Sequence, residues 1–306
     1  MSGKNAGAAR SILDRLKSRA RTEAVDPQVV QVRYGHERFL YRLSRSPYAE
    51  KFILKGAMLM VAWFGETLRP TRDIDLLGFG DVSEAELSRV LRAVCAIEVE
   101  FDGMEYDADS VRIEDIRNED AYGGKRATLK AVLGASRVTI QIDIGIGDAV
   151  HPAAGWIDYP GLLDLPMPHL RAYSMETVLA EKFHAMVRLG EVNSRMKDFF
   201  DVYVLASREE FQESVLRSAV IATFERRSTR LPNGIPAALN ESFALAQERQ
   251  GQWRSFLRRS RLESVPGNLA EVMPLIREFL LPLVEGSRTG GPDAARRWPP
   301  GGPWSL

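Results

Sequence analysis

Three aspartates stand in segments of the chain whose other residues are mostly apolar. Asp73 and Asp75 are separated by one residue in RDIDLLGFG, and Asp143 lies in VTIQIDIGIGD. Each segment is predicted to be a β-strand, in which alternate side chains share a face. Asp73 and Asp75 therefore point to one face, and Ile74 and Leu76 point to the other. Aspartate is uncommon in strands. If the two strands are neighbours in one sheet, the three carboxylates converge on one patch.

Carboxylates at this spacing repel one another and need a compensating cation or water. A divalent metal is an efficient compensation, and Mg²⁺ in particular is held by one or two carboxylates together with the phosphates of a substrate. The three aspartates therefore indicate a phosphoryl-transfer site that uses Mg²⁺ or Mn²⁺ and a nucleoside triphosphate (NTP). For any one of them alone, a solvent-exposed polar strand face is the alternative.

The elements that have to position these residues form a mixed α+β region followed by helices. A helical flank is predicted over 1–48, an α+β domain over 49–150, an α-helical domain over 151–285 and a flexible tail over 286–306. The α+β region reads as a helix, a strand, a second helix and then several strands. The domain boundary is placed in a stretch rich in proline and glycine, at about 152–168. Beyond it only helices are predicted, near 174–189, 194–206, 209–227, 236–249 and 269–284.

Composition is that of a soluble globular protein, with 45% hydrophobic and 27% charged residues. No apolar run approaches the roughly 20 residues that cross a bilayer, and the N-terminus lacks the apolar core of a secretory signal. The single cysteine, Cys95, excludes an internal disulfide framework. These features predict a cytoplasmic protein that makes no use of a membrane.

The net charge is zero, but its distribution is uneven. Residues 73–120 contain fifteen acidic residues and four arginines, whereas residues 214–261 contain nine arginines and three glutamates. The arginines between Arg217 and Arg261 could therefore hold a polyanion such as RNA. Solvated helix faces that carry arginine are the equally weighted alternative.

The segment KGAMLMVAWFGETLRPTRDIDLL resembles the signature of the polymerase-β-like nucleotidyltransferases, and more narrowly that of the AbiEii toxin family. In that family an LKGG turn precedes an Arg-x-Thr-x-Asp-Ile-Asp segment. The residues that match before the aspartates are Lys55, Gly56, Arg69 and Thr71. Ala57 departs from the pattern, because the family usually has a glycine or small polar residue there. Ala57 lacks a hydroxyl, although its backbone N–H can still donate.

A second block, YSMETVLAEKFHAMVRLGEVNSRMKDFFDVYVLA, is similar to the family's Glu-Lys helix and the acidic helix that follows it. The matching residues are Glu181, Lys182, Lys197, Asp198 and Asp201. Lys182 falls on the apolar stripe of its helix, so it either extends its ammonium group to solvent or reaches a cleft and neutralises triphosphate charge. Asp198 and Asp201 share a helix face and are expected to orient Lys182, a nucleotide group or an acceptor hydroxyl. His184, two residues after Lys182 in the same predicted helix, is expected on the surface of that helix.

The resemblance implies a polymerase-β-like nucleotidyltransferase whose α-helical domain completes the cleft. It implies metal ligation by Asp73, Asp75 and Asp143, with Lys182, Asp198 and Asp201 completing the catalytic set. The implied nucleotide-binding residues are Lys55, Gly56, Ala57, Arg69, Thr71 and Lys182. The implied acceptor is RNA, with the tRNA 3′ end the best candidate, and the implied partner is a cognate antitoxin. A catalytically inactive binding module of the same fold, or a protein-adenylylating enzyme, stays open as an alternative.

Overall fold

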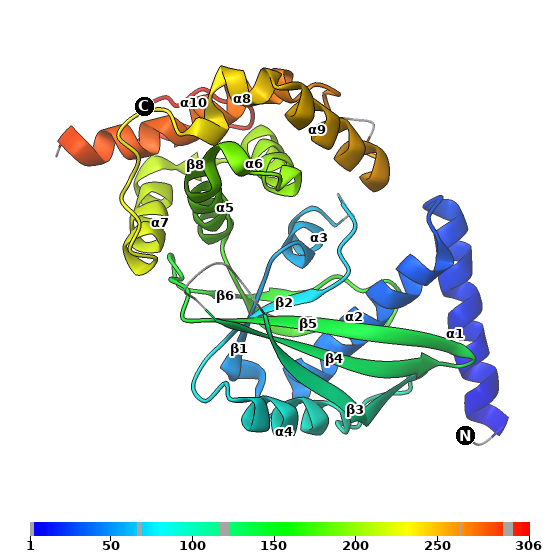
Figure 1. Ribbon diagram of the computed structural model, residues 1–306. Helices are drawn as coiled ribbons and strands as arrows, with labels where there is room; N and C mark the ends of the chain where they lie inside the picture. The colour runs from blue at the N-terminus through cyan, green and yellow to red at the C-terminus, as the bar shows by residue number, and fades with distance from the viewer. Residues whose placement is uncertain (1–2, 66–68, 117–122, 263–264, 290–295) are drawn as a thin grey trace. The chain divides into compact units, whose positions relative to one another are not determined.

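The chain divides into two compact units. The computed structural model describes residues 3–65, 69–116, 123–262, 265–289 and 296–306 (Figure 1). The first unit contains Met1–Gly147 and Gly155–Ala172, and the second contains Asp148–Ala154 and Tyr173–Leu306.

A seven-stranded mixed sheet forms the centre of the first unit (Figure 1). Its strands are β1 (Phe52–Lys55), β2 (Ile74–Gly78), β3 (Met104–Ile116), β4 (Gly124–Leu133), β5 (Ser136–Ile146), β6 (Gly155–Asp158) and β7 (His169–Ala172). Their order is β3-β4-β5-β2-β1-β7-β6. β2 runs parallel to β5 and β1 parallel to β7, while the other neighbours are antiparallel. The predicted α+β fold class is confirmed.

The stretch 152–168 was predicted to be a linker between domains, but part of it forms a strand of this sheet. β6 and β7 come from that region and just beyond it, where strands were not expected, and they add two strands at the edge beside β1. Pairing of Leu54 with Ala172 connects them to the core. These strands are only four residues long, too short for alternation to distinguish them from loop.

The described part of the first unit has four helices, two of which begin at a capping side chain. They are α1 (Gly3–Thr22), α2 (Pro27–Arg45), α3 (Met58–Phe64) and α4 (Glu84–Cys95), with the 3₁₀ turn η1 (Ala49–Lys51). The side chain of Asp26 caps α2 and that of Ser83 caps α4, each by accepting a hydrogen bond from a backbone N–H in the first turn. A Cβ on Gly35 of α2 would lie 2.9 Å from Ile140 Cδ1. α2 therefore packs directly on the isoleucine face of β5.

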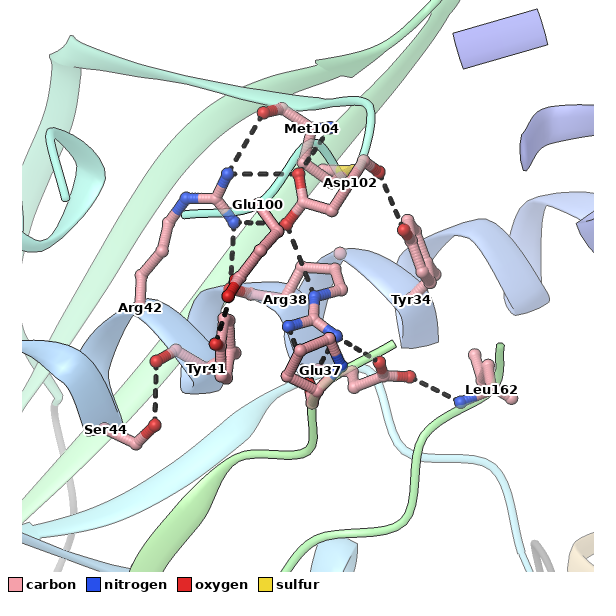
Figure 2. Close-up of polar contacts among 12 residues, drawn as sticks. Tyr34, Glu37, Arg38, Tyr41, Arg42, Ser44, Glu100, Asp102, Met104 and Leu162 are labelled. Carbon is pink, nitrogen blue, oxygen red and sulfur yellow. Dashed lines mark hydrogen bonds and ion pairs between the residues drawn. The ribbon is translucent and has the colours of Figure 1, made fainter. Parts of the chain in front are cut away.

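A buried polar network fixes α2 to two loops (Figure 2). Arg42 donates to both carboxylate oxygens of Asp102, at 2.6 and 3.1 Å. Glu37 accepts from the backbone N–H of Leu162 at 2.7 Å and from Arg38 Nη1 at 3.1 Å. Burial raises the pKa of Glu37 to about 7. The network holds the loop before β3 and the loop before β7 against the same helix.

The second unit is mainly helical (Figure 1). It contains α5 (Met175–Leu189), η2 (Gly190–Val192), α6 (Met196–Arg208), β8 (Phe211–Gln212), α7 (Glu213–Arg226), η3 (Ala237–Leu239), α8 (Glu241–Leu245), α9 (Gln247–Ser260), α10 (Leu269–Thr289) and β9 (Arg297–Trp298). The single helix predicted over 236–249 is wrong, because the chain bends at Ala246, whose ψ of 128° is not helical. The bend allows Phe243 to stack on Phe199 while Trp253 is fully buried.

The chain end differs from the flexible tail predicted for 286–306. α10 continues to residue 289, and β9 pairs with β8. Trp298 is fully buried and donates to a backbone carbonyl of α6, and Trp304 stacks on Phe279 with ring centroids 5.7 Å apart. Two buried or stacked tryptophans can order a segment that has no hydrophobic periodicity. Residues 290–295 of this prediction lie outside the described residues.

No helix in the described ranges combines the length and the apolar character that a bilayer span requires.

Candidate active site

The three aspartates meet on one face of the first unit's sheet. Asp75 on β2 is directly opposite Asp143 on β5 in the parallel ladder, and Asp75 is also opposite Lys55 on β1. Asp73 lies one residue before β2 rather than inside it as predicted. One carboxylate oxygen from each aspartate lies within 4.8 Å of the others. The predicted convergence of the three carboxylates is present in the structure.

The turn between β1 and α3 is built around Gly56. Its φ is +74°, in the left-handed region that favours glycine, and a Cβ there would lie 2.0 Å from Asp75 Oδ2. The Asp75 carboxylate therefore occupies the space that any other residue at position 56 would fill. Ala57 follows at the N-cap of α3 and makes no side-chain capping bond.

Thr71 and Arg126 orient two of the carboxylates. Thr71 Oγ1 donates to Asp73 Oδ1 at 2.8 Å. Arg126 on β4 is directly opposite Asp143 and donates from Nε to Oδ1 at 2.8 Å and from Nη2 to Oδ2 at 2.7 Å. This hydrogen-bonded fork raises the pKa of Arg126, and the charge of Asp73 adds to the effect. The bidentate pair fixes the orientation of Asp143.

Sequence reasoning missed Arg126, although a signal for it exists. Ala127 and Leu129 on β4 are fully buried, so alternation places Arg126 on the opposite, polar face of the strand. Alternation alone does not indicate which strand pairs with β4, and so it could not connect Arg126 with Asp143. The pairing register supplies that connection.

The donor set of the aspartate cluster fits a hard divalent cation. Three carboxylates supply only oxygen ligands, which Mg²⁺ and Mn²⁺ prefer. Their oxygens converge within 4.8 Å, and the absence of a Cβ at Gly56 leaves room for Asp75 to take this position. The residues present could therefore hold a metal ion.

Lys55 and Arg69, which are also predicted to bind the nucleotide, lie close to this cluster in the sequence, and Lys55 also lies next to it in the sheet. Lys55 shares the face of Asp75 as its cross-strand neighbour. Arg69 is buried, with 9% of its surface exposed, and is four residues before Asp73.

Lys182, Asp198 and Asp201 form a compact ionic cluster in the second unit. Lys182 Nζ lies 2.9 Å from Asp198 Oδ1 and 2.6 Å from Asp201 Oδ2, and both aspartates are 1% exposed. Arg195 Nε adds a contact of 2.6 Å to Asp198 Oδ2. Burial would raise the pKa of Asp198, but Lys182 and Arg195 outweigh it and hold that pKa well below the usual range. Both aspartates pair with Lys182, which is one of the three partners that the sequence left open for them.

A second polar cluster in this unit was not anticipated. Arg227 lies 3.1 Å from Asp148 Oδ1 and 3.4 Å from Glu181 Oε1, and its Nη1 is 3.2 Å from His184 Nδ1. His184 is only 2% exposed and also contacts Thr229, at 2.9 Å, so its predicted surface position is wrong. Polar partners allow a histidine to be buried, and they come from a loop that helical periodicity does not place.

The arginines between Arg217 and Arg261 serve more than one purpose. Arg217 pairs with Glu213, and Arg249 donates to the carbonyl of Glu191, so these side chains contribute to structure. Three exposed arginines lie on α9, namely Arg254, Arg258 and Arg259. Arg254 and Arg258 are four residues apart and therefore share a face of the helix.

Two solved structures from Helicobacter pylori are similar to this chain. The JHP933 crystal structure is 14% identical, with a TM-score of 0.44, and the match covers 81% of this chain and 89% of that one. The "putative nucleotidyltransferase from H. pylori" is 16% identical, with a TM-score of 0.43, and the match covers 81% of this chain and 92% of that one. No curated protein sequence matches the chain.

The family assignment rests on the match to a family model. The model for "Nucleotidyl transferase AbiEii toxin, Type IV TA system" matches residues 38–276. That range contains the Gly56 turn, the three aspartates and the Lys182 cluster. The match spans most of both units, and the catalytic class is that of a nucleotidyltransferase. The chain therefore belongs to the AbiEii family of nucleotidyltransferase toxins from type IV toxin–antitoxin systems.

Proposed function

We propose that this protein transfers a nucleoside monophosphate from an NTP to a hydroxyl group of RNA, with the 3′ end of tRNA as the best candidate. The observation that carries the proposal is the convergence of Asp73, Asp75 and Asp143 beside the Gly56 turn. Blocked translation and growth arrest would follow in the cytoplasm, and a cognate antitoxin would counteract them.

In this proposal the three aspartates hold Mg²⁺ or Mn²⁺ and the turn at Gly56 contacts the nucleotide. The cation supplies charge neutralisation on the phosphates and orientation of the reacting oxygens. Backbone N–H groups of the turn, with Lys55, Arg69 and Thr71 nearby in the sequence, would position the triphosphate. Asp143 would help to remove the proton of the acceptor hydroxyl.

The reaction is an in-line displacement at the α-phosphorus. The hydroxyl oxygen of the acceptor forms a bond to that phosphorus while the bond to the β-phosphate bridging oxygen breaks, and pyrophosphate leaves with the electron pair. Such a reaction depends mainly on positioning and on stabilisation of developing charge. Lys182, held between Asp198 and Asp201, would act as the cation that neutralises triphosphate charge.

RNA is the proposed acceptor because exposed arginines gather on α9. Arg254, Arg258 and Arg259 are exposed, and neutralisation of backbone phosphates by such residues gives sequence-independent, salt-dependent affinity. A triple Arg→Gln variant on α9 is expected to weaken RNA binding and reduce its salt dependence, while NTP binding is retained.

The decisive experiment incubates the purified protein with total bacterial RNA, Mg²⁺ and each α-³²P-labelled NTP in turn. Asp75→Asn serves as the inactive variant, since it keeps the shape of the side chain and removes one ligand charge. Lys125→Gln is a matched control, because Lys125 lies next to Arg126 and pairs with Asp115 at 2.6 Å. Products are resolved on denaturing RNA and protein gels.

Label in a tRNA-sized band with the wild-type protein and Lys125→Gln, but not with Asp75→Asn, would support RNA nucleotidyl transfer and identify the base. Label in a protein band would instead favour adenylylation of a protein. No label with any NTP would refute transfer under these conditions and favour an inactive binding module, the alternative that Ala57 suggests.

A further inference from the structure

Asp143 is held by a charged partner, Arg126. Both of its oxygens accept from the guanidinium of Arg126, at 2.8 and 2.7 Å, and Gln141 Nε2 lies 3.5 Å from Oδ1. Asp73 accepts from the uncharged hydroxyl of Thr71. A positive charge is therefore already placed against one of the three carboxylates that could hold a metal ion.

We propose that Arg126 competes with the divalent cation for Asp143 and so keeps cation occupancy at this carboxylate low until substrate phosphates arrive. The inference deepens the proposed function and rests on it, because it concerns how the same aspartate cluster is loaded. Arg126 is a positioning residue here, since it acts through Asp143, which accepts both of its described hydrogen bonds at the site.

Two physical effects support the competition. A cation that coordinates Asp143 has to share or replace charge-assisted hydrogen bonds, which are among the strongest in proteins. The guanidinium also repels the cation directly: Coulomb's law for a unit charge and a dication about 5 Å apart in water corresponds to more than tenfold in the dissociation constant. The side chains of Arg126 and Asp143 are only 36% and 17% exposed, so solvent screens the repulsion between the guanidinium and the cation incompletely.

The competition between Arg126 and the cation would also set the order in which the cation and the nucleotide bind. A cation that arrives bound to phosphates brings negative charge with it, which offsets the repulsion between the guanidinium and the cation. Cation binding without nucleotide is then weak, and cation binding with nucleotide is favoured. The order of loading follows from the pairing of Arg126 with Asp143.

The test measures Mn²⁺ binding to the purified protein without nucleotide, by electron paramagnetic resonance of free Mn²⁺ and by calorimetry. Arg126→Gln is expected to bind Mn²⁺ at least tenfold more tightly than the wild-type protein. Arg126→Lys, which keeps the charge and loses the fork, is expected to fall between them. Lys125→Gln removes an equal charge from the adjacent residue, on the other side of the strand, and is expected to bind as the wild type does.

A further variant isolates the pair itself. In an Asp143→Asn background, Arg126→Gln is expected to raise Mn²⁺ affinity less than it does in the wild-type chain, because only the direct repulsion between the guanidinium and the cation is then removed. Circular dichroism checks that each variant is folded. Equal or weaker Mn²⁺ binding by folded Arg126→Gln, or an equal gain in Lys125→Gln, would overturn the inference. Since no transfer is measured, this failure is distinct from an absence of RNA labelling, which concerns the proposed function.

Discussion

Replacement of Gly56 by alanine tests whether the turn before α3 positions a catalytic carboxylate. A Cβ at this residue would lie 2.0 Å from Asp75 Oδ2, whereas real Cβ atoms keep at least 3.0 Å, so the carboxylate has to move by about 1 Å (3.0 − 2.0). A displacement of this size at a reacting centre costs about 100-fold in rate. The positive φ of +74° adds about 1–2 kcal/mol of backbone strain.

Gly80→Ala is the matched control, because it separates strain from displacement. Gly80 has a φ of +76°, almost the same as Gly56, but nothing lies within 4 Å of a Cβ built there. Both variants are expected to lose unfolding free energy through backbone strain, and Gly56→Ala also through displacement of the Asp75 side chain, as measured by denaturant titration. Only Gly56→Ala is expected to lose about 100-fold of the transfer rate, together with Mn²⁺ affinity at the aspartate cluster.

Two results would refute this role of Gly56. If Gly56→Ala keeps the activity and the Mn²⁺ affinity of Gly80→Ala, the Asp75 carboxylate either moves without consequence or does not belong to the reacting site. If both variants lose activity equally, backbone strain rather than contact with Asp75 explains the glycine.

Two further predictions concern buried charge. Lys182→Met leaves the fully buried Asp198 and Asp201 without their shared cation, so unfolding free energy should fall by about 3–5 kcal/mol; a loss no larger than that of an exposed Lys→Met control would contradict it. Because the pKa of Asp198 is lowered on folding, its stabilising contribution should be present at neutral pH and lost as the pH falls below the usual aspartate range. The contribution of Glu37 to stability depends on pH in the opposite direction, because the pKa of Glu37 rises from 4.5 to about 7 in the folded chain. Its contribution should therefore be lost as the pH rises from about 4.5 to 7, by about 3 kcal/mol in total. Glu37→Gln should accordingly gain stability relative to the wild type between pH 5 and pH 8 in urea unfolding, and a difference that does not vary with pH would show that Glu37 is not the group responsible.

The acidic patch could be predicted because its signal is local. Asp73, Asp75 and Asp143 stand out as charged residues in apolar strand segments, and alternation places the side chains of β2 and β5 on defined faces. The glycine at position 56 is conspicuous for the same reason, since it follows an apolar strand and precedes a helix. Such features depend on neighbours in the chain, which the sequence displays directly.

The partners of these residues were decided by the tertiary structure. Arg126 meets Asp143 only because β4 pairs with β5 in one register, and a shift of one residue would turn Arg126 to the other face. His184 is buried because Arg227 and Thr229 reach it from a distant loop. Pairing between residues far apart in the chain depends on packing of the whole unit, and no local pattern encodes it.

The same distinction explains the errors in chain organisation. The stretch 152–168 has the proline and glycine content of a linker, yet it contributes β6 to the sheet because β7 offers a free strand edge. The chain end has no periodicity, yet Trp298 is fully buried. By itself the amino-acid sequence determined the kind of chemistry and the faces that carry it. Which side chains meet, and which short segments become ordered, was decided by long-range packing, because burial of a tryptophan or a strand edge depends on the surface that the rest of the fold presents.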